Sequence, residues 1–105
     1  MLTEIEIIKI ANDYLKKKEQ KGGIEFAIQE ELSIKKNYGI IFSYNSKEYI
    51  ETKDEGASLI GNSSFLVENK TGKIVVFGTN RSDDYYIQEY EAGRWPDIIR
   101  LSDLE

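Results

Sequence analysis

The feature that most constrains the fold is an apolar stripe near the N-terminus. Ile7, Ile8, Ala11, Tyr14 and Leu15 recur at steps of three and four residues, which is the spacing of one face of a helix. An amphipathic helix must bury that face against another element. The rest of the chain therefore has to supply an apolar surface on which residues 3–20 can pack.

The ends of this helix are also signalled by sequence. Thr3 and Glu6 have the spacing of a capping box, with Leu2 and Ile7 placed as the hydrophobic staple around it. The glycine pair at 22–23 is expected to stop the helix, because glycine readily adopts the left-handed conformation that follows a last helical turn.

The apolar partner is predicted to be a sheet. Apolar and polar residues alternate in several segments, as they do in strands. A tight turn at Asn69–Gly72 joins two of these segments into a hairpin, and residues 33–37 are expected to form another hairpin connection. The predicted strands are residues 24–29, 38–45, 64–69 and 73–79, and the first of them could run on through Leu32 or Ile34.

A second, shorter helix is predicted after the last strand. Ser82 is a favourable N-cap, and Asp83 and Asp84 follow where the helix dipole favours negative charge. Tyr86, Ile87 and Tyr90 would form its buried stripe, and Gly93 would end it. The tail from Arg94 is apolar enough to pack on the domain, but its pattern favours neither helix nor strand.

These elements predict one α+β domain covering residues 1–105. An N-terminal amphipathic helix packs on a four-stranded antiparallel sheet, a short C-terminal helix follows, and both helices lie on one face of the sheet. In such a meander, residues 46–63 and 79–84 should share one rim. The first of these segments lacks clear periodicity, is long enough for a binding loop, and has room for a short helix at 55–60.

Composition narrows the chemistry. The chain has no cysteine and no histidine, which excludes disulfides, thiolate metal sites and a cysteine nucleophile and removes the commonest general base. The net charge is −5, so nucleic acid is not expected as a partner. There is no apolar run long enough for a signal sequence or membrane span, and we expect a cytoplasmic protein that does not enter a membrane.

Carboxylates are the remaining candidates for chemistry. Glu51, Asp54 and Glu55 could present oxygen ligands to Ca²⁺ or Mg²⁺, but their spacing matches no EF-hand and a solvated acidic loop explains them more simply. Asp83 and Asp84 are already explained by the helix start. No catalytic residue, metal or cofactor is therefore predicted.

The order of several short segments resembles a known family. Ile41–Ser46, Tyr49–Thr52, Leu59–Asn62, Lys70–Gly72 with Phe77–Thr79, and Tyr86–Glu91 are similar in sequence and spacing to the immunity protein 35 family, which overlaps the domain named after YrhB. The resemblance covers nearly the whole chain up to Arg94. Three positions depart from the family pattern: Tyr38-Gly39 stands where the family tends to have Trp, Ser64 where it has Pro, and Lys53 where it has Gly.

This resemblance implies a bacterial immunity protein. Such proteins stay in the cytoplasm of the producing cell and neutralise a cognate polymorphic toxin domain by stoichiometric binding, without catalysis. A surface for the toxin can be predicted from the residues themselves, since acids steer basic partners and tyrosines anchor interfaces. The predicted partner-binding residues lie along the shared rim and are Tyr49, Glu51, Asp54, Glu55, Asp83, Asp84, Tyr85 and Tyr86.

Two other interpretations remain open. A module that binds a small molecule or peptide would need a concave site between helix and sheet. A carboxylate enzyme would need two buried acids facing one cavity. The oligomeric state is open as well, because an edge strand could pair two copies.

Overall fold

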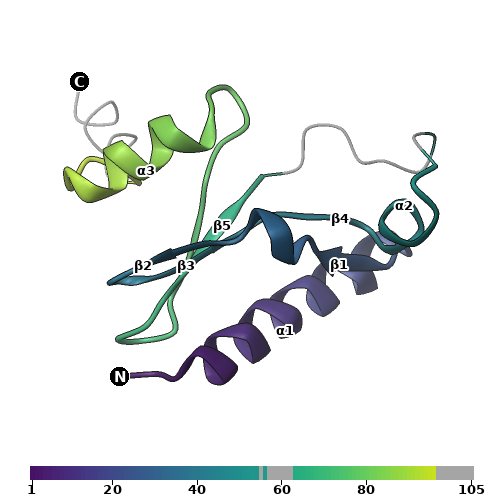
Figure 1. Ribbon diagram of the computed structural model, residues 1–105, viewed down its shortest axis with the longest axis horizontal. Helices are drawn as coiled ribbons and strands as arrows, with labels where there is room; N and C mark the ends of the chain where they lie inside the picture. Colours follow the sequence, from purple (N-terminus) through teal and green to yellow (C-terminus); the bar gives the residue numbers. More distant parts are fainter. Residues whose placement is uncertain (55, 57–62, 97–105) are drawn as a thin grey trace.

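A computed structural model of the chain describes residues 1–54, 56 and 63–96. Figure 1 shows a sheet lying between the long helix α1 (Glu4–Gly22) and the shorter helix α3 (Asp83–Glu91). The α+β class is confirmed, with an N-terminal helix, a four-stranded antiparallel sheet and a short C-terminal helix. The two helices cover opposite faces of the sheet, however, and the expectation that both lie on one face is wrong.

Helix α1 begins and ends as its sequence predicts. The Thr3 backbone N–H donates to Glu6 Oε1 at 2.9 Å, and the Glu6 N–H donates to Thr3 Oγ1 at 3.2 Å, which completes the capping box. Gly23 ends the helix in the left-handed conformation, with φ of 72°. Ile7, Ala11 and Leu15 are buried against the sheet.

The central sheet has the order β2-β3-β5-β6 and is antiparallel throughout. Its strands are β2 (Ile34–Lys36), β3 (Gly39–Phe42), β5 (Phe65–Glu68) and β6 (Ile74–Val76). The predicted hairpin between the last two strands is present, with a turn around Gly72. The segment at 33–37, expected as a connection, instead contains the edge strand β2.

The predicted first strand forms a separate pair. Strand β1 (Phe26–Ile28) pairs with β4 (Tyr44–Ser46), which continues the course of β3 after Ser43. Ile28 lies opposite Tyr44 and Ile34 lies opposite Ile41, so five residues (29–33) face only two (42–43). The surplus is taken up by a 3₁₀ turn, η1 (Glu30–Leu32). Segments β1, η1 and β2 therefore form one interrupted edge along β3 and β4.

Alternation along β3 and β5 explains the two-sided packing. Ile40, Phe42, Phe65 and Val67 belong to the core cluster with α1, whereas Ile41 and Leu66 belong to the cluster with α3. All four residues of β3 are buried because the strand has a helix on each side. A strand with apolar residues on both faces predicts helices on both faces.

Helix α2 (Lys47–Thr52) follows β4 directly. Ser46 is its N-cap, since its Oγ accepts a hydrogen bond of 3.1 Å from the Tyr49 N–H. The short helix expected at 55–60 falls mostly outside the described residues.

Helix α3 begins where predicted, with Ser82 as N-cap and Asp83 and Asp84 in its first turn. Tyr86 and Ile87 are the buried residues of this helix, and Gly93 follows its end with φ of 78°. The Trp95 indole donates to the carbonyl of Val76 at 3.1 Å, so this part of the tail lies against the outer edge of β6. Residues 97–105 of the tail lie outside the described residues.

Candidate functional site

The predicted partner-binding residues divide into two groups, of which the first lies on α2. Tyr49 is half-buried and Glu51 and Asp54 are exposed. The Lys53 ammonium lies 5.8 Å from the centre of the Tyr49 ring, and Asp54 Oδ1 accepts a hydrogen bond of 3.0 Å from the Gly56 N–H. Glu55, predicted to belong to this group, lies outside the described residues. The α2 group thus presents carboxylates beside an aromatic ring.

The second group lies at the start of α3. Asp83 accepts a hydrogen bond of 3.0 Å from Ser64 Oγ, which lies 3.2 Å from Ser43 Oγ. Asp84 is exposed, and the half-buried Tyr85 has the Arg81 guanidinium 5.5 Å from its ring centre. Asp83 therefore links α3 to the strand ends and Asp84 is exposed, while Tyr85 packs partly against the core cluster beneath α3, with its ring centre 5.2 Å from that of Tyr86.

Tyr86 has a different environment from the rest of its group. It is only 4% exposed, and its ring packs on Phe77 at 5.8 Å and on Trp95 at 4.8 Å between ring centres. An added Cβ on Gly78 would overlap the Tyr86 hydroxyl and lie 2.8 Å from Cζ. We therefore assign Tyr86 a packing role beneath α3 and leave it out of the surface proposed below.

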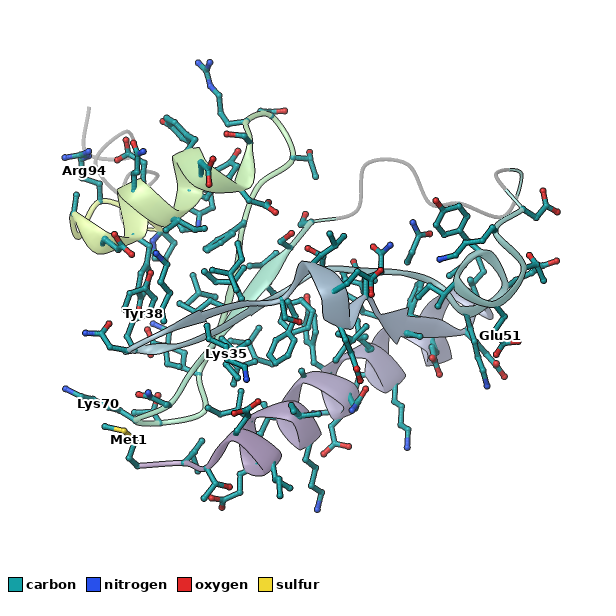
Figure 2. The ribbon with its side chains drawn as sticks, viewed as in Figure 1. Met1, Lys35, Tyr38, Glu51, Lys70 and Arg94 are labelled. Atoms are coloured by element: carbon teal, nitrogen blue, oxygen red, sulfur yellow. The ribbon has the colours of Figure 1, made fainter. Side chains whose placement is uncertain are left out.

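The structure does not bring the two groups together. The hydrogen bonds between Ser43 and Ser64 and between Ser64 and Asp83 do join the ends of the strands to the start of α3, as the shared rim predicts. Residues 47–54, however, continue with β4 away from that point, and Figure 1 shows α2 and α3 toward opposite ends of the long axis. Figure 2 shows Glu51 projecting at the α2 end. The α2 and α3 groups are therefore two separate surfaces.

A groove of about 710 Å³ lies between α1 and the β1–η1–β2 edge. Its floor includes the side chains of Ile40 and Phe42, and Ile8 and Ile28 contribute to its walls. Sequence analysis placed Ile8 in the buried stripe of α1, but Ile8 is 37% exposed. The apolar stripe of α1 is wider than the surface that the sheet covers. A stripe of this width could have indicated the groove from the sequence.

Polar contacts cross this groove at both ends. Glu4 of α1 pairs with Lys35 of β2 at 2.8 Å between Oε1 and Nζ. Toward the other end, Glu19 Oε1 accepts a hydrogen bond of 2.8 Å from the Phe26 backbone N–H. Lys47 Nζ lies 3.8 Å from Glu25 Oε2 and 3.9 Å from Glu51 Oε1, so it connects the groove wall to the α2 group.

Two tyrosines, Tyr38 and Tyr90, connect α3 to the sheet by hydrogen bonds. The Tyr38 hydroxyl donates to Glu91 Oε2 at 2.7 Å, the Tyr90 hydroxyl donates to Glu68 Oε2 at 2.5 Å, and the two rings are 5.0 Å apart. Figure 2 shows Tyr38 reaching from the sheet toward α3. Burial and the acceptor Glu68 raise the pKa of Tyr90 to about 12, and burial with the acceptor Glu91 also raises the pKa of Tyr38. These hydroxyls are locked in structural hydrogen bonds.

Comparison with known protein families gives a match over most of the chain. The family described as immunity protein 35 matches residues 6–93, from the first turn of α1 to the end of α3. The chain belongs to the immunity protein 35 family. That span includes the groove, the α2 group and the α3 group.

A curated relative matches over a shorter region. The uncharacterized protein YrhB of Escherichia coli strain K12 is 38% identical over 53 residues, which is 50% of this chain and 56% of the relative. The chain thus spans about half the length of the curated relative that it matches. No solved structure matches the chain.

Among residues 1–54, 56 and 63–96, no group of three acidic side chains is placed to hold a metal ion, and Glu51 and Asp54 form no such group there. In the same part of the chain, no helix is both long and apolar enough to cross a lipid bilayer.

Proposed function

We propose that this immunity protein 35 chain binds a cognate polymorphic toxin domain in the cytoplasm and neutralises it stoichiometrically, without catalysis. The observation that carries the proposal is the family match over residues 6–93. The chemistry of the chain is compatible, because inhibition by binding needs no catalytic group, and a protein without histidine or cysteine lacks the commonest general base and a thiol nucleophile.

Charge supports a basic toxin surface as the contact. The chain has a net charge of −5, and residues 80–105 contain seven acidic residues against three arginines. An acidic inhibitor attracts a basic partner and accelerates the encounter at low ionic strength. The α2 group supplies Glu51 and Asp54 for this purpose, and the α3 group supplies Asp84 beside Tyr85.

Neutralisation can be tested by co-expression and titration. The product of the gene next to this chain's gene, taken as the candidate toxin, is expressed in a bacterial host with and without the chain, and growth is followed. We expect the chain to restore growth and to inhibit the purified toxin with an end point at one chain per toxin. Turnover of the toxin, or of any compound, by substoichiometric amounts of the chain would contradict a binding mechanism.

The two acidic surfaces can be tested separately. A chain carrying Glu51→Lys with Asp54→Lys reverses the α2 group, and one carrying Asp84→Lys reverses the exposed acid of the α3 group. If a surface contacts or steers the toxin, reversing its charge should slow association with the toxin. The difference in association rate from the wild type should be smaller at high salt. Asp13→Lys is a matched control, because Asp13 is an exposed acid outside both groups and outside the groove lining.

A second candidate function is favoured by one observation. The groove between α1 and the strand edge has a volume of about 710 Å³, which lies within the range of pockets that hold small molecules. A module binding a small molecule or short peptide would use this groove. Calorimetric titration with extracts of small molecules would detect it, and heat-stable ligand recovered without any protein partner would favour this function over toxin neutralisation.

A further inference from the structure

We propose that the groove between α1 and the β1–η1–β2 edge receives an extended segment of the toxin, which pairs with β1 as an added strand. This inference rests on the proposed function and names the surface and the kind of partner segment that it would use. Four observations carry it: the direction of the β1 backbone groups, the position of the Glu19 side chain, the exposure of Ile8 and the charge of the groove walls.

The backbone of β1 has its free hydrogen-bonding side toward the groove. The Lys47 N–H donates to the Glu25 carbonyl and the Gln29 N–H donates to the Ser43 carbonyl, each at 2.8 Å. The backbone N–H and C=O groups of residues 25 and 29 therefore point toward β4 and the residues that flank it. Because these directions alternate along an antiparallel strand, the groups of Phe26 and Ile28 point the other way, into the groove.

The side chain of Glu19 occupies one of the positions that an added strand would use. Its Oε1 accepts the hydrogen bond from the Phe26 N–H at 2.8 Å. A backbone carbonyl of a docked segment would accept from the same N–H in an ordinary ladder. Glu19 thus satisfies the open edge of β1 in the free protein and has to yield that N–H when a strand docks.

The side of α1 that faces the groove presents one apolar side chain, Ile8, that such a strand would cover, among the polar residues Glu4, Asn12, Lys16 and Glu19. Ile8 is 37% exposed, although it belongs to the apolar stripe of the helix. Below it, Ile40 and Phe42 are 7% and 3% exposed and form part of the groove floor. Alternate side chains of an added strand point toward one face, so apolar residues at every second position would reach Ile8 and this floor.

Charge indicates what else the segment carries. The Glu4–Lys35 pair neutralises one end of the groove. At the other end the lining includes Glu19, Glu25, Lys16 and Lys47, and Glu51 of α2 pairs with Lys47 at 3.9 Å, so three carboxylates lie there against two ammonium groups. The excess of carboxylates there is complementary to a basic residue. The predicted occupant is therefore an extended segment with alternating apolar residues and a Lys or Arg near the α2 end.

The test fills the groove and measures binding of the toxin domain encoded beside this chain's gene. Asn12 is exposed on α1 and lines the groove, so Asn12→Trp places a large ring in it. We expect this variant to bind about tenfold more weakly or worse. Asn12→Ala, which removes the amide without filling the groove, and Asp13→Trp, at an exposed position outside the lining, should each stay within about twofold of the wild type.

A second readout reports strand pairing directly. Amide hydrogen exchange of Ile28, measured by NMR with and without toxin, should slow in the complex because its outward N–H gains a partner. Unchanged binding by Asn12→Trp together with unchanged exchange at Ile28 would overturn the groove assignment while toxin neutralisation stands. Weaker binding by Asn12→Trp without protection of Ile28 would overturn strand pairing. A wild-type chain that neither binds nor neutralises the toxin would overturn the proposed function as well.

Discussion

The carboxylate of Glu19 on α1 accepts a hydrogen bond of 2.8 Å from the backbone N–H of Phe26 on β1. A comparable contact exists at the opposite edge, where the Trp95 indole donates to the Val76 carbonyl at 3.1 Å. Both contacts satisfy backbone groups on edge strands, which would otherwise be available for pairing with another chain. In each case a side chain from outside the sheet covers the edge.

Removing the Glu19 carboxylate should destabilise the fold modestly. We expect Glu19→Ala to lower the free energy of unfolding by about 1 kcal/mol, the typical net contribution of one such hydrogen bond. Urea unfolding followed by circular dichroism measures the change. Glu25→Ala is the control, because its exposed ion pair with Lys47 at 3.8 Å should contribute little. Equal losses in the two variants would contradict a structural role for the Glu19–Phe26 bond.

The Tyr38 and Tyr90 hydroxyls should make the protein sensitive to alkali. Burial and hydrogen bonding raise the pKa of Tyr90 to about 12 and raise that of Tyr38, whereas an unfolded tyrosine ionises near about 10. Between these values the unfolded chain has lost protons that the native state keeps. The stability contribution is therefore complete below about pH 10 and declines as pH rises through the native pKa values.

Unfolding in urea at about pH 8 and at about pH 11 tests this linkage. The Tyr38→Phe/Tyr90→Phe double variant should lose less stability between the two pH values than the wild type does. Part of the decline should remain, because burial also raises the pKa values of Tyr14 and Tyr44. Tyr49→Phe, on α2 and outside this cluster, is the control. Identical alkaline losses in the wild type and the double variant would exclude the proposed linkage.

The parts of the fold that sequence predicted depend on local signals. The capping box at Thr3, the turn before Gly72 and the N-cap at Ser82 each depend on a few neighbouring residues. The parts that it missed depend on distant contacts. Residues 24–29 have ordinary strand alternation, and only the register against β3 and β4 reveals the three-residue surplus that η1 absorbs. Local periodicity contains no information about that register.

The candidate site was predictable to a similar degree. The acidic and aromatic composition identified Glu51, Asp54, Asp84 and Tyr85 as surface residues, although their separation depends on where β4 leads. A concave site between helix and sheet was named only as a requirement of the binding module, and its lining was not predicted, because residues 33–37 were expected as a connection and not as the edge strand β2. Tyr86 was predicted both in the buried stripe of the second helix and among the partner-binding residues, and the structure shows it buried, with its ring packed on Phe77 in the cluster beneath α3.

Two glycines should respond very differently to alanine. A Cβ on Gly39 would overlap the carbonyl oxygen of Val67 and lie 3.0 Å from its carbon, within the paired centre of the sheet. We expect Gly39→Ala to cost about 3 kcal/mol or more, as overpacking with backbone displacement does. At Gly23 nothing lies within 4 Å, but φ is 72°, so Gly23→Ala should cost about 1 kcal/mol. Thermal unfolding of both variants measures the contrast, and similar losses would contradict the close approach at Gly39.

A last prediction concerns Lys53, a non-glycine residue with positive φ. Lys53 follows α2 in the left-handed conformation, with φ of 60°, and its N–H donates to the Tyr49 carbonyl at 2.7 Å. This conformation is unfavourable for a residue with a Cβ and suits glycine at the position after a helix. The gain from glycine is partly offset, because the flexible residue loses more entropy on folding and the Lys53–Tyr49 contact is removed.

We therefore expect Lys53→Gly to stabilise the protein by about 0.5–1 kcal/mol, read from its urea midpoint at constant slope. Thr52→Gly is the matched control one residue earlier, inside α2, where glycine should destabilise by about 1 kcal/mol. The Thr52 hydroxyl donates to the Glu48 carbonyl at 2.7 Å and accepts from the Asp54 N–H at 3.2 Å. Thr52→Ala is therefore measured as well, and the difference between Thr52→Gly and Thr52→Ala gives the backbone effect without these two hydrogen bonds. A loss of stability in Lys53→Gly equal to that in Thr52→Gly would refute strain at Lys53 and leave its contact with Tyr49 as the dominant contribution.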